Sequence, residues 1–172
     1  MKLPTASKNK LAPRSSGGVG GFTLIEIMTV IGLFTIIAGV GMFFDFDNFR
    51  AYSFHSERDT LISTLQHARA EAVSSICRGP CDEGKPHGVK ILDNKFIIFQ
   101  GTDYVSADRD YDAIMDANPN MLHGGLPEVV FEQLSGDVDT PGDITLTDNY
   151  SGRKSTISIN SEGQILWTDE RI

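Results

Sequence analysis

The feature that most constrains this chain is a nearly uncharged apolar segment close to its start. Residues 22–44 read FTLIEIMTVIGLFTIIAGVGMFF, and Glu26 is their only charged side chain. As an α-helix this segment would rise about 35 Å, which is enough to cross the hydrocarbon core of a bilayer. A helix that is apolar on every face is not typical of the surface of a water-soluble fold. We therefore expect a membrane-spanning helix over residues 22–44.

The charges on the two sides of this segment are of opposite sign. The chain of 172 residues has 23 acidic and 15 basic side chains, yet residues 1–21 carry only basic ones. The positive-inside rule keeps such a leader in the cytoplasm and places the acidic remainder outside. A secretory signal peptide fits less well, because small residues follow its apolar region, which spans about 7–15 residues. Here the small residues, 15–21, come before the apolar segment.

The junction between the leader and the apolar segment resembles a known processing signal. Gly21-Phe22-Thr23-Leu24-Ile25-Glu26, preceded by a basic leader, is similar to the cleavage motif of type IV prepilins and pseudopilins. The resemblance implies cleavage between Gly21 and Phe22, N-methylation of Phe22, and pairing of Glu26 with the N-terminal amine of a neighbouring subunit. An unpaired carboxylate in hydrocarbon costs about 2.5–3.5 kcal/mol on insertion scales. The alternative for Glu26 is snorkelling toward the lipid headgroups.

The helix is expected to continue beyond the membrane as an amphipathic segment over residues 45–76. This stretch contains neither proline nor glycine, and its apolar residues recur at helical spacing. The apolar stripe consists of Phe54, Leu61, Leu65, Ala68, Ala72 and Ile76. The opposite face, expected to lie in solvent, carries Glu57, Arg58, Gln66, Arg69 and Glu71. Gly79-Pro80 predicts the end of the helical region.

Residues 77–172 are expected to form a β-rich globular head. Short apolar or alternating segments bounded by turn residues predict antiparallel strands. These segments are residues 89–92, 95–99, 129–131, 143–147, 155–159 and 164–167. One buried face should be shared by Ile157, Ile159, Ile165 and Trp167. The predicted fold class is α+β, with a long N-terminal helix packed on a small antiparallel β-sandwich.

Residues 61–72, LISTLQHARAEA, resemble the helix-end signature of the GspH/FimT family of minor pseudopilins and minor pilins. Together with the N-terminal motif, this resemblance implies a pilin-like fold. It covers most of the chain, and residues 100–126 match it least.

Cys77 and Cys81 bracket Arg78-Gly79-Pro80 just after the predicted helix. The predicted topology places them outside the cytoplasm, where disulfides persist. We predict a disulfide that closes a small loop. Free thiols are one alternative, and zinc with His87 as a third ligand is another, although a fourth ligand is lacking.

Residues 102–120 are acidic and rich in turn residues, which predicts a solvated surface loop. Asp108-x-Asp110-x-Asp112 begins like a calcium loop, but the glycine and glutamate that an EF-hand requires are missing. Calcium binding is the alternative. Because no motif for a nucleophile elbow, a zinc protease or a phosphate loop is present, we expect no enzyme, cofactor or metal site. The four histidines, His55, His67, His87 and His123, are expected at the surface.

The resemblance implies a structural minor subunit of a type II secretion pseudopilus or a type IV pilus. It would be a single-pass protein of the bacterial cytoplasmic (inner) membrane, with its head outside, at or near the filament tip. Its expected partners are other pilins or pseudopilins, the prepilin peptidase and methyltransferase, and the inner-membrane assembly platform. The leader over residues 1–21 would be absent from the mature chain.

Two other functions remain open. One is a DNA-binding minor pilin of a competence pilus, with contacts from Arg153 and Lys154 and a patch that adds Arg69, Arg78, Lys85, Lys90 and Lys95. The acidic mature chain makes nucleic-acid binding unfavourable. The other is a membrane-anchored hydrolase or adhesin. The missing catalytic motifs disfavour a hydrolase, and an adhesin would present an aromatic patch such as Tyr104 with Tyr111.

Overall fold

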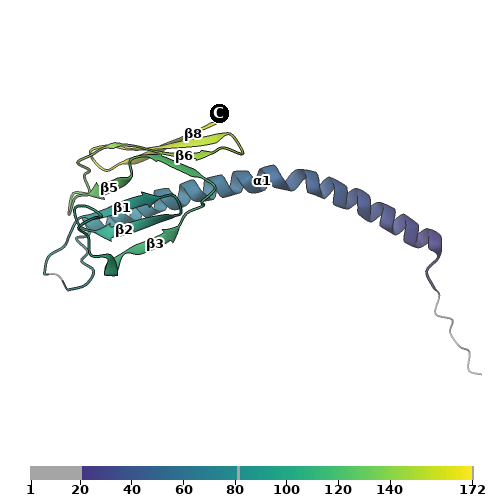
Figure 1. Cartoon of the computed structure of the whole chain (residues 1–172), viewed down its shortest axis with the longest axis horizontal. Coiled ribbons are helices and arrows are strands. Elements are labelled where there is room, and N and C mark those ends of the chain that lie inside the picture. The colour runs from purple at the N-terminus through teal and green to yellow at the C-terminus, as the bar shows by residue number, and fades with distance from the viewer. Residues whose placement is uncertain (1–20, 81, 172) are drawn as a thin grey trace, which may run out of the picture. The chain divides into compact units, whose positions relative to one another are not determined.

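The structure is a computed structural model that describes residues 21–80 and 82–171, with the backbone alone for residues 42–49. Within these residues, helix α1 (Leu24–Val73) is followed by strands and one 3-10 turn, η1 (Arg109–Tyr111) (Figure 1). The strands are β1 (His87–Leu92), β2 (Lys95–Gln100), β3 (Ala113–Asp116), β4 (Leu122–Gly125), β5 (Glu128–Phe131), β6 (Gly142–Asp148), β7 (Arg153–Ile159) and β8 (Ile165–Arg171). The chain divides into two compact units, Met1–Phe43 and Phe44–Ile172.

The strands form two four-stranded antiparallel sheets. The first sheet has the order β3-β2-β1-β5, and the second has the order β4-β6-β7-β8. In the first sheet, β1 and β2 form a hairpin in which Leu92 pairs with Lys95 across Asp93-Asn94. In the second, β6, β7 and β8 are consecutive neighbours along the chain. With one long helix and two antiparallel sheets, the fold class is α+β, as predicted.

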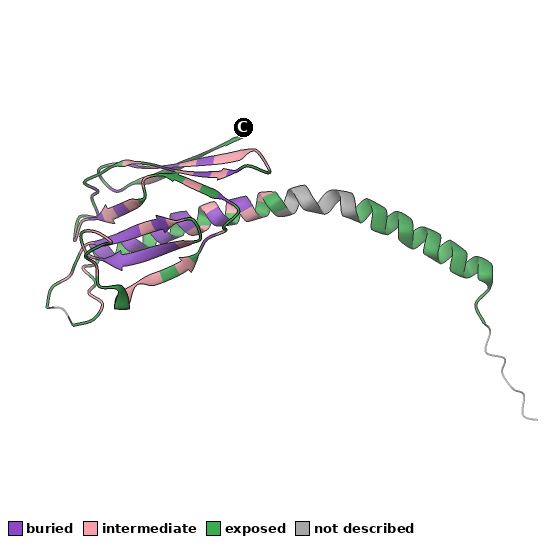
Figure 2. Cartoon of the chain, viewed as in Figure 1, coloured by how far each residue is buried: buried purple, intermediate pink, exposed green. Residues whose placement is uncertain are grey.

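The second half of α1 shares one hydrophobic core with both sheets. Of the predicted apolar stripe, five residues are buried: Phe54, Leu61, Leu65, Ala68 and Ala72. Leu61 and Leu65 join a cluster that includes Phe96 of the first sheet and Ile157 of the second. Figure 2 shows buried and exposed positions alternating along this part of α1, as expected for a helix with one face in the core.

The predicted end of the helix was wrong by three residues. Helix α1 ends at Val73, and the Ile76 N–H donates to the Glu71 carbonyl 3.0 Å away. This bond satisfies one of the carbonyls that have no partner at a helix end. Because Ile76 lies outside the helix, it leaves the stripe and is 40% exposed.

All six predicted strands are present, but two strands were missed. The missed strands are β3 and β4, which lie in the segment with no assigned structure. Strand β3 falls inside the predicted acidic loop, where its pairing with β2 supplies backbone hydrogen bonds that a local pattern does not reveal. In the second sheet, Ile157 pairs with Trp167 and Ile159 with Ile165, so these side chains share one face as predicted, but only Ile157 and Ile159 are buried on it. Trp167 is nevertheless half-exposed, at the edge strand.

The rest of the predicted acidic loop packs against the first sheet instead of lying wholly in solvent. Ile97 and Phe99 are buried on β2, although neither belongs to the main core cluster. The ring of Tyr104 meets the ring of Phe99 edge-on, with centroids 5.5 Å apart. The Arg109 guanidinium lies 4.3 Å from the Tyr104 ring centroid, in cation–π range. These contacts hold the segment onto the sheet.

Candidate functional site

The predicted cleavage junction lies at the very start of α1. Residues 21–23 have no regular secondary structure, and the helix begins at Leu24. The Glu26 N–H donates to the Thr23 carbonyl (3.1 Å) and is also 3.3 Å from Thr23 Oγ1. Thr23 therefore caps the helix, because its oxygens satisfy an amide that has no partner within the helix. The capping fixes the start of α1 two residues after Phe22.

The junction is open on the described part of the chain. Phe22 is 78% exposed, and a side chain added at Gly21 would meet no atom within 4 Å. The Glu26 side chain is also exposed, and no ion pair to its carboxylate occurs among the described residues. A protease can thus reach the Gly21–Phe22 bond, and a cation from outside the chain can reach Glu26. The preceding residues, 1–20, lie outside the described part.

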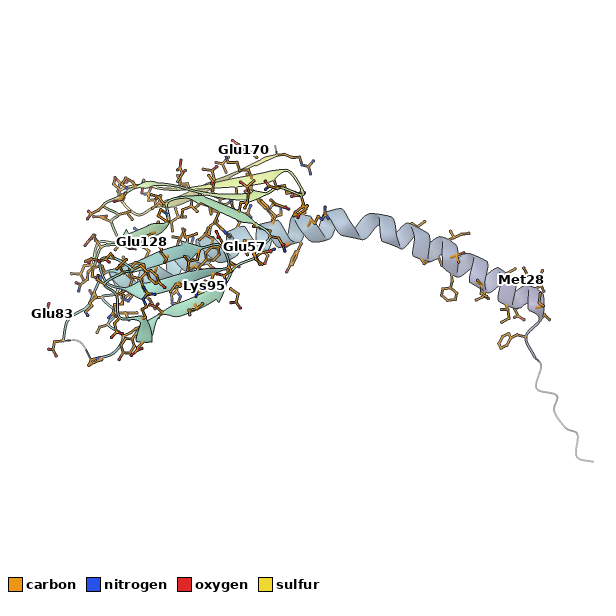
Figure 3. The ribbon with its side chains drawn as sticks, in the orientation of Figure 1. Met28, Glu57, Glu83, Lys95, Glu128 and Glu170 are labelled. Carbon is orange, nitrogen blue, oxygen red and sulfur yellow. The ribbon has the colours of Figure 1, made fainter. Side chains whose placement is uncertain are left out.

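The segment that follows is long and apolar enough to cross a membrane. This candidate span covers Leu24–Gly41, and it is the one such helix among the described residues. Its side chains project into open space, Met28 among them (Figure 3). Its two threonine hydroxyls donate back to the helix, from Thr29 to the Glu26 carbonyl (2.9 Å) and from Thr35 to the Gly32 carbonyl (2.8 Å). Polar groups that are satisfied within the helix are the kind that hydrocarbon tolerates.

Two carboxylates on α1 that were expected on the solvent face are buried in the structure. Glu57 and Glu71 are 7% and 5% exposed. Glu57 Oε1 accepts a hydrogen bond from the Asn118 N–H (3.0 Å) and lies 3.3 Å from His123 Nε2. Figure 3 labels Glu57 where α1 passes beneath the strands. Burial is tolerated because a buried charge with hydrogen-bonding partners loses less on leaving water.

Glu71 lies beside one arginine and two histidine side chains, at the other end of the interface between α1 and the sheets. Arg78 Nη2 forms an ion pair with Glu71 Oε1, and His67 Nε2 lies 3.4 Å from the same oxygen. His87 of β1 is 1% exposed, and its Nε2 lies 3.8 Å from Glu71 Oε2. The side chains of His87 and His123 are 1% and 3% exposed beside carboxylates, so these two histidines do not lie at the surface as predicted.

The segment that contains the cysteines is held at several points. The Arg78 N–H donates to Gln100 Oε1 (2.6 Å), and Arg78 Nη1 donates to the Tyr111 carbonyl (3.2 Å). Gly79 has a φ of 93° and lies against the Tyr111 ring, where a Cβ would clash. Cys81 lies outside the described residues, so its disulfide with Cys77 stays a prediction. An intact mass two hydrogens below that of the reduced chain would establish it.

The residues proposed for DNA contact lie at one end of the second sheet. Arg153 pairs with Arg171 across β7 and β8, and Lys154 pairs with Glu170. Arg153 Nη1 lies 3.2 Å from His55 Nε2. Nearby, the Arg50 guanidinium carbon is 5.7 Å from the Tyr150 ring centroid, at a cleft of about 280 Å³ that also includes Asp148.

Three other basic residues of the proposed DNA patch, Arg69, Arg78 and Lys90, contact other groups of the head. Arg69 donates to the Gly136 and Glu162 carbonyls, at 3.4 and 3.0 Å, and so ties two turns to α1. Arg78 forms an ion pair with Glu71, and Lys90 Nζ lies 3.3 Å from Glu128 Oε2. These side chains stabilise the head and are not assembled into one basic surface.

The aspartates of the acidic loop cap backbone groups. Asp103 Oδ1 accepts from the N–H groups of Val105 (3.0 Å) and Ser106 (2.9 Å), and Asp108 Oδ1 accepts from the Asp110 N–H (3.2 Å). Hydrogen bonds from Ser106 lower the pKa of Asp103 below its usual value. No group of three or more His, Cys, Asp or Glu side chains within the described residues is placed to hold a metal ion. The calcium alternative therefore gains no support from a cluster of such side chains there.

Comparisons of the chain with protein-family models, with curated proteins and with solved structures found no match.

Proposed function

We propose that the chain is a structural minor subunit of a pilus-like filament, a pseudopilin or minor pilin with a pilin-like fold. It is cut between Gly21 and Phe22, methylated on Phe22 and assembled through α1. The observation that carries this proposal is the position of the processing motif. The motif lies in an exposed, irregular segment directly before a capped helix whose first 18 residues could cross a membrane.

The first half of α1 supports a role in a filament of packed helices. A carboxylate one turn into an apolar span is expensive unless a cation accompanies it. Cleavage creates such a cation, because the new amine of Phe22 is positively charged near neutral pH. The exposed Glu26 carboxylate can then pair with the amine of a neighbouring subunit and set the stagger between two helices. The work of the subunit is mechanical, and the energy for assembly comes from a separate ATPase.

The second half of α1 supports the role of a helix built into the core of the head. Its core-facing side chains join both sheets in one hydrophobic cluster. The buried Glu57 and Glu71 connect α1 to the second and the first sheet through His123 and His87. The proposed location is the bacterial inner membrane, with the head outside and the filament's other subunits, the prepilin peptidase and the assembly platform as partners.

Mass spectrometry of the membrane-extracted protein tests the proposal. The expected mature chain begins at N-methylated Phe22. The variant Gly21→Val should remain uncut, because the small residue at the cleavage point is replaced. The structure has open space at Gly21, so a defect would arise at the protease rather than in folding.

Gly32→Val is the matched control for this variant. It makes the same substitution where a Cβ also meets nothing within 4 Å, but inside the span. It should be processed like the wild type. Efficient processing of Gly21→Val, or a mature chain that begins elsewhere, would contradict the assignment.

A second candidate function, DNA binding, is favoured by the basic cluster alone. Arg153 and Arg171 line one pocket, Lys154 follows Arg153 on β7, and Arg50 lies against the Tyr150 ring. None of the four forms an ion pair within the described residues. Phosphate contacts of this kind weaken steeply as salt rises. Fluorescence anisotropy of a labelled duplex with the full chain in detergent should then show salt-dependent binding. Arg50→Ala with Lys154→Ala should abolish it while Lys95→Ala preserves it, and no binding at low salt would exclude the function.

A further inference from the structure

Two buried polar atoms face each other at the junction of α1 and β1 without completing a hydrogen bond. They are Glu71 Oε2 and His87 Nε2, 3.8 Å apart, and neither has a hydrogen-bond partner within the described part of the chain. Buried polar atoms without partners are rare and usually mark a functional or switchable group. The pair therefore needs an explanation beyond packing.

A hydrogen bond between Glu71 Oε2 and His87 Nε2 needs one more proton. His87 Nδ1 lies 3.0 Å from the Lys85 carbonyl, and a carbonyl oxygen can only accept, so Nδ1 carries the hydrogen. In the neutral imidazole, Nε2 then carries a lone pair, which faces the Glu71 carboxylate. Two acceptors cannot bond to each other. A proton on Nε2 turns this contact into a charge-assisted hydrogen bond to Glu71.

Protonation of His87 affects the other charged groups around the pair. Glu71 also receives Arg78 from the cysteine segment and His67 from its own helix, both on Oε1. The β-strand neighbours paired with His87 are Gln100 and Phe131, which carry no charge. Burial lowers the pKa of His87, Glu71 raises it, and Arg78 and His67 lower it. The balance places His87 in its neutral form at pH 7.

We infer that His87 and Glu71 form a proton switch that controls how firmly the segment around Cys77 and Arg78 is held to the head. Because the positive charge of Arg78 opposes protonation of His87, a proton on His87 must weaken the hold on Arg78 by the same free energy. At low pH, the Glu71 carboxylate therefore binds protonated His87 of the sheet more strongly and Arg78 of the loop more weakly.

Arg78 is the partner of Glu71 that belongs to the segment after the helix. His87 is enclosed, whereas the Arg78 side chain is 27% exposed and lies beyond the end of the helix. Release of Arg78 also removes a positive charge from the neighbourhood of protonated His87. The predicted acid state keeps the helix and sheets but exposes the backbone amides after Ile76.

Hydrogen exchange of the full chain in detergent tests this inference. Between pH 7.5 and pH 5.0, after correction for the intrinsic exchange rate, peptides covering residues 74–80 should lose about tenfold in protection, equivalent to about 1.4 kcal/mol. Peptides covering β6 and β7 should keep theirs. His67→Gln should behave like the wild type, whereas His87→Gln should show no acid-dependent loss at residues 74–80.

A second measurement keeps the test decisive if His87→Gln fails to fold. Imidazole NMR of the wild type should show His87 as the Nδ1–H tautomer at pH 7.5. Arg78→Gln should raise the pKa of His87, a change that a purely structural role for Arg78 does not require. The inference is overturned if residues 74–80 exchange equally at both pH values, if His87→Gln shows the same acid response as the wild type, or if the pKa of His87 is unchanged in Arg78→Gln.

Discussion

At the scale of single residues, Glu26 has two roles that substitution can separate. Its carboxylate is the proposed partner of a neighbour's amine, and its backbone N–H is capped by Thr23. Thr23-x-x-Glu26 also has the spacing of a capping box, in which glutamine serves as well as glutamate. Glu26→Gln therefore removes the charge and keeps a polar side chain of capping-box type, while Glu26→Ala removes the whole polar side chain; the cap of Thr23 on the backbone N–H of residue 26 remains in both variants.

Both Glu26 variants should be cleaved and inserted normally, and both should fail to join the filament. Co-purification with the other filament subunits after membrane solubilisation measures incorporation. Thr35→Ala, which alters a polar side chain within the span, should co-purify like the wild type. Normal incorporation of Glu26→Ala would make Glu26 a snorkelling residue, and normal incorporation of Glu26→Gln alone would show that a polar group suffices.

The residues that the sequence did not reveal are those whose partners lie far along the chain. Gly21, Phe22 and Glu26 could be singled out because their motif is contiguous. Glu57 and Glu71 looked like solvent-facing charges, since an acidic residue beside an apolar stripe is ordinarily exposed. Their burial depends on His123 and His87, which β4 and β1 bring to the helix. The sequence did carry one signal of burial, because both glutamates lie on the flank of the apolar stripe. Glu71 is one residue before Ala72, and Glu57 is four residues before Leu61.

At the scale of elements, α1 was predictable over nearly its whole length because its apolar periodicity is local. The hairpin strands were predictable for the same reason, since alternation and turn residues lie side by side in the sequence. Strands β3 and β4 were not, because each has only four residues and β4 ends in two glycines. Glycine weakens a strand signal, and pairing with β2 and β6 stabilises these strands instead.

The packing of α1 against the sheets predicts which helix positions determine the stability of the head. Leu65 is fully buried in the shared core, whereas Tyr52 is 73% exposed on the same helix. Leu65→Ala should lower the free energy of unfolding by about 2–5 kcal/mol, from lost burial and the cavity left behind. Tyr52→Ala should change it by no more than about 0.5 kcal/mol.

Urea unfolding followed by Trp167 fluorescence measures both variants. Trp167 is the single tryptophan of the chain, and Arg58 of α1 lies 5.8 Å from its ring centroid. Its emission therefore reports separation of β8 from the helix. Equal unfolding midpoints for Leu65→Ala and the wild type would mean that the helix contributes little to the core.

At the scale of the whole molecule, the division into two compact units separates folding of the head from maturation at the membrane. The unit Phe44–Ile172 contains both sheets and the main core cluster, and the proposed cleavage point lies in the other unit. Every buried apolar residue of the described chain lies at Phe54 or beyond. Removal of the leader should therefore leave the head's core unchanged.

The uncut Gly21→Val precursor and the mature wild type should accordingly unfold at the same urea midpoint, with Trp167 fluorescence as the readout in the same detergent. Only the mature form should co-purify with other filament subunits, because only it has the free amine that Glu26 of a neighbour can bind. Processing would then regulate assembly through one new charge and not through the fold of the head. A lower midpoint for the precursor would show instead that the leader disturbs the head, and incorporation of the precursor into filaments would show that the amine is dispensable.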